Sequence, residues 1–198
     1  MHTITLAEDE IDDVLYLARA NEEQELSQLL NQLAIRYHCQ ARDILEHSVD
    51  PQSGNTSLHY CAANGLDTLL QTLILTLAME HNAPPGTSSA AGLINVKNAA
   101  GNTPLHWAAI NGHLSAAKLL VAAGADVWAR NGAGNLPVFE AEQAGKDEMV
   151  TFLLKEGGEA QGIEGAEEDQ DSGEGAGDAK TNDVEDTAEE LERSTLDD

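Results

Sequence analysis

Apolar residues recur at helical spacing in two short segments between residues 98 and 131. In the first segment, Leu105, Ala108 and Ala109 line one face of a short helix, and the small alanines allow a neighbouring helix to approach closely. The second segment, at about residues 113–123, carries Leu114, Ala117, Leu119, Leu120 and Val121. The pattern predicts a helical hairpin with one apolar side. Such a hairpin cannot bury that side alone, so it needs stacked neighbours.

Turn residues mark where these two helices begin and end. Thr103 and Pro104 start the first helix, because threonine caps helix N-termini and proline is tolerated at the first helical position. Gly112 ends it, since glycine readily adopts the left-handed conformation of a helix terminus. Gly101 permits the preceding turn, and we expect His106 to hydrogen-bond within that turn and to the next unit.

Three other segments repeat this succession of turn and helices. Residues 54–65 and 134–137 match the segment 98–131 at spacings of 47 and 33, and residues 14–21 match it at a spacing of 90. The pattern resembles the ankyrin repeat of 33 residues, so the spacing of 47 predicts an insertion of 14. The resemblance implies an all-α solenoid of about four repeats, each a β-turn finger followed by two helices.

The outermost units lack parts of the pattern, as solenoid ends do, because one side of each end faces water. We therefore expect an ankyrin-repeat domain at residues 1–155. Its caps are predicted at about residues 12–50 and 131–155, and its central repeats at about 51–97 and 98–130.

Local composition predicts where regular structure is interrupted. Residues 31–50 are expected to extend a helix and then to loop out at 39–48, and residues 82–92 to form an exposed loop. Gly, Glu and Asp dominate residues 156–198, which predicts a disordered acidic tail. A short transient helix is expected within it at about 183–196.

Charge divides unevenly along the 198 residues. Residues 1–155 carry 18 acidic and 8 basic side chains, a net charge of −10, and residues 156–198 carry 17 acidic and 2 basic side chains, a net charge of −15. This balance argues against direct binding of nucleic acid, which requires a basic surface. It favours a basic protein partner, attracted by electrostatic steering.

No pattern in the sequence predicts catalysis or a cofactor. The seven histidines show no zinc-site spacing, and no nucleophile-elbow, metalloprotease or P-loop motif occurs. Cys39 and Cys61 are too few for a disulfide framework and are expected to be thiols in a reducing compartment. The N-terminus lacks signal-peptide features, and residues 66–79 are too short and polar to span a membrane. We therefore expect a non-enzymatic protein without cofactor, metal ion or membrane association.

Ankyrin stacks bind partners through their fingers and the exposed side of the first helices, so outward positions there are the candidate binding residues. Trp128 replaces a small polar residue, and an exposed tryptophan is typical of binding hot spots; the alternative is that it packs on its own turn. Tyr60 and Trp107 stand where leucine is usual, which favours core packing with one exposed edge for both; binding is the alternative. The candidates are Tyr60, Ala63, Asn64, Asn102, Trp107, Ile110, Asn111, Trp128, Arg130, Glu140 and Gln143.

Two segments carry a narrower resemblance. The sequences GNTPLHWA at residues 101–108 and FEAEQAGKDE at residues 139–148, followed by an acidic tail, resemble the fungal ankyrin-repeat chaperones of small-subunit ribosomal protein S-three. The resemblance implies binding of newly made S-three, a basic protein, which is kept soluble for small-subunit biogenesis in cytoplasm and nucleus. We expect a monomer before client binding. The alternative hypothesis is a general ankyrin-repeat adaptor in signalling or transcription.

Overall fold

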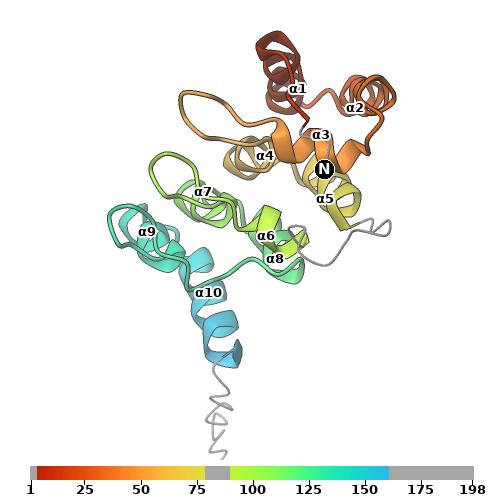
Figure 1. Ribbon diagram of the computed structural model, residues 1–198. Coiled ribbons are helices and arrows are strands. Elements are labelled where there is room, and N and C mark those ends of the chain that lie inside the picture. The colour runs from red at the N-terminus through yellow and green to blue at the C-terminus, as the bar shows by residue number, and fades with distance from the viewer. Residues whose placement is uncertain (1–3, 79–89, 161–198) are drawn as a thin grey trace, which may run out of the picture. The chain divides into compact units, whose positions relative to one another are not determined.

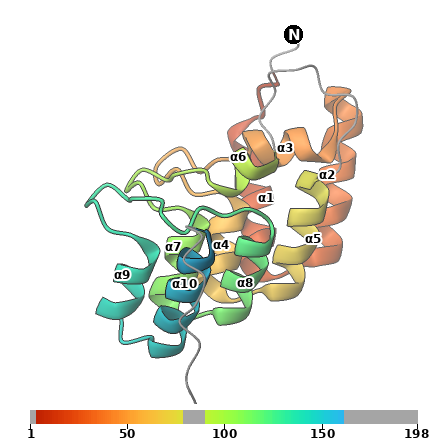
Figure 2. The same cartoon turned by 90° about the horizontal axis from the view of Figure 1, so that it is seen from below.

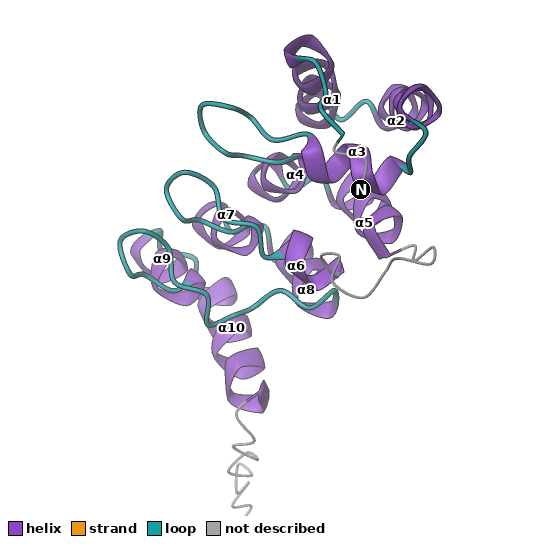
Figure 3. Cartoon of the chain, in the orientation of Figure 1, coloured by secondary structure: helices purple, strands orange, loops and turns teal. Residues whose placement is uncertain are grey.

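The computed structural model describes residues 4–78 and 90–160, whose regular structure consists of helices (Figures 1 and 3). The first helices of the repeats, which we call the inner helices, pack on one another in chain order. They are α1 (Glu8–Ala20), α4 (Ser57–Asn64), α7 (Pro104–Asn111) and α9 (Pro137–Gln143). The second helices, which we call the outer helices, are α2 (Glu23–Tyr37), α5 (Asp67–Ala78), α8 (Leu114–Ala122) and α10 (Asp147–Ala160). The predicted all-α solenoid of about four repeats is confirmed.

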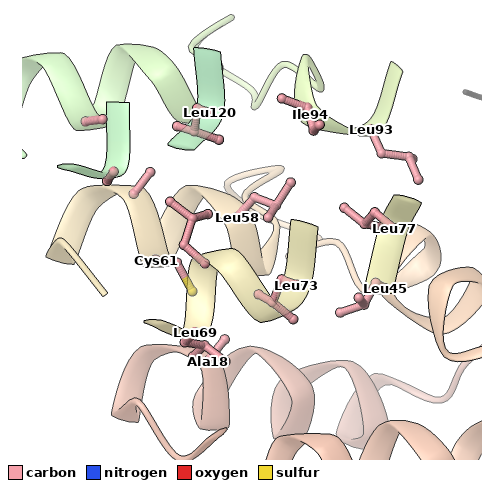
Figure 4. Packing of buried hydrophobic residues seen from close by; sticks show 14 of the residues in the cluster. Ala18, Leu45, Leu58, Cys61, Leu69, Leu73, Leu77, Leu93, Ile94 and Leu120 are labelled. Carbon is pink, nitrogen blue, oxygen red and sulfur yellow. The ribbon is translucent and has the colours of Figure 1, made fainter. Parts of the chain in front are cut away.

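The loops that lead into α4, α7 and α9 project from the same side of the stack, and we call them the fingers (Figures 1 and 2). Between the two layers of helices lies a continuous apolar core of leucine and alanine side chains (Figure 4). Ala62, Ala108 and Ala109 are fully buried, so successive inner helices approach closely as predicted. Cys61 is also fully buried, and this burial raises the pKa of its thiol to about 12. The thiol therefore serves as a small core side chain.

Two short helices stand where loops were predicted. The prediction of a loop at residues 39–48 is wrong, because α3 (Ala41–His47) buries Ile44 and Leu45 against the core. Its first turn is capped by the Asp43 carboxylate, which accepts a hydrogen bond from the backbone N–H of Gln40 at 2.9 Å. Similarly, α6 (Ala90–Ile94) begins within the loop predicted at residues 82–92, whose residues 82–89 lie outside the described part of the chain.

The last outer helix continues beyond the predicted start of the tail. α10 extends to Ala160, so residues 156–160 are helical rather than disordered. The reason is tertiary packing: Gly157 is buried, and a Cβ atom at this position would lie 3.0 Å from Cζ2 of Trp128. The rest of the predicted tail, residues 161–198, and the helix predicted at 183–196 lie outside the described residues.

Buried histidines join successive repeats. Nδ1 of His59 accepts a hydrogen bond from the backbone N–H of Thr56 at 3.1 Å, and its Nε2–H donates to the carbonyl oxygen of Asn102 at 3.0 Å. His106 repeats this arrangement one unit later, with Thr103 at 3.2 Å and the carbonyl of Asn135 at 3.1 Å. The predicted role of His106 is confirmed. Both rings must be neutral to accept at Nδ1 and donate at Nε2.

The fingers stack so closely that a side chain at Gly101 has no room. The N–H of Gly132 donates to the carbonyl of Ala100 at 2.9 Å, which brings the two backbones together. Gly101 has a φ of +77°, and a Cβ atom there would lie 2.4 Å from the backbone nitrogen of Gly132. Only glycine accommodates both the left-handed conformation and this approach.

We expect Gly101→Ala to lower the free energy of unfolding by about 2–3 kcal/mol, because it adds a backbone clash to the cost of a left-handed conformation. Urea unfolding followed by circular dichroism measures this change. Gly134→Ala is the matched control, since Gly134 has a φ of +83° but a Cβ atom there would have no described residue beyond its chain neighbours within 4 Å. The control should lose about 1 kcal/mol. Equal losses in the two variants would contradict the role of finger stacking.

We expect the protein to lose stability between pH 7 and pH 5. Burial lowers the pKa of His59 to about 4 from 6.5, and burial also lowers the pKa of His106. The unfolded chain therefore takes up protons below pH 6.5 while the folded chain keeps His59 neutral. This stabilisation is complete above pH 6.5 and decreases toward pH 4, by about 2 kcal/mol at pH 5 for His59.

Urea unfolding at pH 7, 6 and 5 tests this expectation, with His59→Gln as the comparison because glutamine does not titrate. The variant should show a shallower loss of stability over this range, with the remaining slope coming from His106. The same slope in both proteins would show that His59 does not control the acid sensitivity. Asp50 and Glu10 contribute little over this range: hydrogen bonds lower the pKa of each carboxyl from an ordinary value that already lies below pH 5, so the stability that they add is lost mainly at lower pH.

Candidate protein-binding surface on the inner helices

An apolar hollow lies between two inner helices. Tyr60 and Ala63 of α4 and Trp107 of α7 line it together with Asn55 and His59, and its volume is about 90 Å³. Tyr60, Ala63 and Trp107 are half-buried, and neither aromatic ring belongs to the buried core. The structure thus brings together three of the predicted binding residues. Core packing of Tyr60 and Trp107 with one exposed edge, which the sequence favoured, agrees with their half-buried side chains.

A third aromatic residue, Tyr16 of α1, occupies the equivalent position one repeat earlier. Asn21 ends α1 in the left-handed conformation, with a φ of +60°, as Gly65 ends α4 and Gly112 ends α7. Aligning these three terminators matches Tyr16 with Tyr60 and Trp107. The predicted spacing of 90 for the first unit is therefore wrong by one residue.

The sequence analysis did not include Tyr16 among the binding candidates, because a spacing of 90 aligned it with His106, which is buried. Its side chain is 66% exposed. Arg19, one helical turn further along α1, reaches the ring of Tyr60 with its Cζ 4.2 Å from the ring centroid, so Tyr16 lies on the same side of α1. Asn21 was the signal in the sequence that could have identified Tyr16, because asparagine, like glycine, can end a helix in the left-handed conformation. We call Tyr16, Tyr60 and Trp107 the aromatic column.

A carboxylate stands beside this column in the first finger. Oδ2 of Asp50 accepts a hydrogen bond from the Tyr60 hydroxyl at 3.0 Å and lies 3.7 Å from Nη2 of Arg19. Backbone hydrogen bonds from Ser53 and Gln52 lower the pKa of Asp50, so this group carries a negative charge at neutral pH. The surface therefore combines one exposed and two half-buried aromatic rings with a negative charge.

Two other predicted residues contribute to the framework of the fingers. Oδ1 of Asn102 accepts a hydrogen bond from Asn131 Nδ2 at 2.8 Å. Oε1 of Glu140 accepts from Asn131 Nδ2 at 2.7 Å and from Asn135 Nδ2 at 3.1 Å. These contacts explain why polar residues are half-buried there, since they stabilise one finger against the next.

The remaining predicted residues extend this surface along the inner helices. Ile110 is half-buried on α7, one helical turn beyond Trp107, whereas Gln143 is exposed on α9. Asn64 and Asn111 are exposed at the C-terminal ends of α4 and α7. Their roles in binding stay predictions.

Two predicted residues lie between α8 and α9, apart from the hollow. The Trp128 side chain is 43% exposed and packs against Gly157 of the outer helix α10. Arg130 is exposed and donates from Nη1 to the carbonyl of Gly134 at 2.8 Å. The structure thus does not bring Trp128 to the aromatic column, although its exposed edge leaves a binding role as a prediction.

The chemistry of this surface suits binding. Residues 4–78 and 90–160 contain no group of three or more histidine, cysteine, aspartate or glutamate side chains placed to hold a metal ion. In the same residues no helix has the length and apolar character needed to cross a membrane. Aromatic rings beside a hydrogen-bonded carboxylate can instead hold an apolar and basic segment of another protein.

Among solved structures, a chain in a crystallised protein complex is similar to this chain. A chain in the crystal structure of the yeast ribosomal protein Rps3 in complex with its chaperone Yar1 superposes with a TM-score of 0.66 and 31% sequence identity. The match covers 76% of this chain and 95% of that chain. Similarity at this identity extends to sequence as well as fold.

Curated relatives agree with this comparison. Ankyrin repeat-containing protein YAR1 of Saccharomyces cerevisiae is 29% identical over 156 residues, which cover 78% of this chain and 73% of the relative. Human ankyrin repeat domain-containing protein 13C is 36% identical over 98 residues, but these cover 50% of this chain and 15% of the relative. The family profile described as ankyrin repeats (3 copies) matches residues 6–131 and 77–164. The stacked helical hairpins, the histidine bridges and these matches together show that the chain belongs to the ankyrin-repeat family.

Proposed function

We propose that this protein is a non-enzymatic chaperone that binds ribosomal protein Rps3 and keeps it soluble. The observation that carries the proposal is the similarity to Yar1, named as the chaperone of Rps3, in a match that covers 95% of a chain in their complex. Coverage of nearly the whole of that chain supports a shared task, whereas a single shared repeat would support only a shared fold.

The aromatic column supplies the apolar part of such an interaction. Tyrosine and tryptophan bury large areas with few rotatable bonds and are enriched at binding hot spots. Tyr16 is mostly exposed and Trp107 borders the hollow on α7, so a client segment crossing the inner helices can contact both. Packing of the repeats does not require an exposed tyrosine on α1.

The charge of the chain supplies the electrostatic part. Residues 1–155 have a net charge of −10 and residues 156–198 a net charge of −15. Opposite charge accelerates association with a basic client and opposes binding of RNA to this chain. Tethered acidic groups also occupy basic client surfaces at a high effective concentration.

The proposal extends to when and where the client is bound. We propose that newly made Rps3 is held until it joins the assembling small ribosomal subunit, in both cytoplasm and nucleus, and that the protein is a monomer before it binds. A general adaptor in signalling or transcription remains the second candidate, since the ankyrin fold alone is compatible with many partners.

Co-expression with Rps3 followed by gel filtration at low and moderate salt tests the proposal. We expect a soluble 1:1 complex with this chain, and precipitation of Rps3 expressed alone. Deleting residues 161–198 should weaken the complex more at low salt than at high salt, because screening already removes part of the charge attraction. Failure of the two proteins to co-elute at low salt would remove the chaperone proposal and favour the adaptor.

A matched pair of variants tests the binding surface. We expect Tyr16→Ala to weaken the complex about tenfold while leaving thermal unfolding nearly unchanged, because the side chain is 66% exposed. Ile35→Ala on the outer helix α2 is the control, since Ile35 is 76% exposed and lies in the other layer of helices. Equal effects of the two substitutions would show that the client does not use the aromatic column.

A further inference from the structure

Three side chains meet where the first repeat joins the first finger. The guanidinium of Arg19 lies over the Tyr60 ring at 4.2 Å, and its Nη2 is 3.7 Å from Oδ2 of Asp50. The Tyr60 hydroxyl donates to the same Oδ2 at 3.0 Å. The ring and the carboxylate together hold a cation by a cation–π contact on one side and an ion pair on the other.

The negative charge of Asp50 is not needed for the finger. Oδ1 of Asp50 accepts hydrogen bonds from the backbone N–H groups of Gln52 at 2.9 Å and Ser53 at 2.8 Å. In the next two fingers Asn98 and Asn131 accept the bond from the second residue after them with neutral amide oxygens at 3.0 Å, and their other bond comes from the fourth residue rather than the third. The amide oxygen of an asparagine at position 50 can therefore accept bonds of this kind from the backbone, and such a turn does not require the negative charge of Asp50.

The positive charge of Arg19 is likewise not needed for packing. The equivalent positions on the next two inner helices, counted from the left-handed terminators, are Ala63 and Ile110. The Arg19 side chain is 46% exposed, and 3.7 Å is longer than a charge-assisted hydrogen bond of about 2.8 Å. A half-exposed ion pair of this kind contributes little to stability, so Arg19 is held weakly.

We propose that Tyr60 and Asp50 form a binding site for an arginine side chain of the client, and that Arg19 occupies this site until the client displaces it. Arginine is preferred over lysine because its planar guanidinium stacks on an aromatic ring while it donates to a carboxylate. The inference rests on the proposed function, because a basic client supplies the arginine. Tyr16 and the hollow at Trp107 flank the site, so the client segment contacts rings before and after this arginine.

Arg19 acts as an internal competitor in this arrangement. It keeps the ring and carboxylate covered in the free protein and lowers affinity for weakly basic segments that cannot displace it. A client arginine gains the contacts that Arg19 gives up, and Arg19 then extends into solvent. The site therefore favours a segment that places an arginine between two apolar side chains.

Dissociation rates of the complex between the full chain and Rps3 test the inference, measured by exchange with an excess of labelled wild-type chain. We expect Asp50→Asn to dissociate about tenfold faster, since the turn persists while the charge is lost. Arg19→Met should dissociate about threefold more slowly, because the competitor is removed while the aliphatic length is kept. In the Asp50→Asn background Arg19→Met should have no effect, because the two substitutions act on one site.

Glu25→Gln on the outer helix α2 is the control for a general change of charge, since Glu25 is exposed away from the inner helices. Thermal unfolding of each variant shows whether it is folded. If Asp50→Asn and Glu25→Gln dissociate at the wild-type rate, the arginine site is wrong while the chaperone proposal stands. If the wild-type chain forms no complex with Rps3, the chaperone proposal fails and the arginine site fails with it.

Discussion

The bond from a buried histidine to the next repeat's finger is the interaction on which the architecture depends. His59 and His106 each hold their own helix start through Nδ1 and the following finger through Nε2. Both bonds require a neutral ring, and burial keeps it neutral by lowering the pKa. Local helix initiation and contact between repeats are therefore coupled through one side chain. Gly101 permits the close approach of the fingers that this coupling demands.

Regular stacking also places the candidate binding surface. Because each inner helix packs on the next in the same way, equivalent positions line up across repeats, and Tyr16, Tyr60 and Trp107 become neighbours although they are far apart in sequence. The alanines on the buried side of these helices allow the stacking, which leaves the opposite side for large aromatic residues. Departures from the repeat pattern coincide with the proposed arginine site: an aspartate stands where later fingers use asparagine, and an arginine stands where later helices use apolar residues.

Much of the fold could be predicted from the sequence because its signals are local. The Thr-Pro start and the glycine end placed α7 at its observed bounds of Pro104 and Asn111. Tyr60, Ala63 and Trp107 were identified as outward positions, and they line one hollow. Tyr16 was missed since its repeat lacks those signals, and an error of one residue in register replaces an exposed position by a buried one. Trp128 lies in the loop that leads into α9, as expected, but only the structure shows that its ring packs on Gly157 of α10.

The amino-acid sequence by itself determined the repeat type, the paired helices and the acidic balance, because turn residues, apolar spacing and charge are properties of neighbouring residues. Only the tertiary structure decided that residues 41–47 and 156–160 are helical, since Ile44, Leu45 and Gly157 gain their burial from distant segments. It also decided the register of the first repeat and the meeting of Arg19, Asp50 and Tyr60. These contacts arise between separate repeats, and the free energy of such packing has no signature in any single segment of the chain.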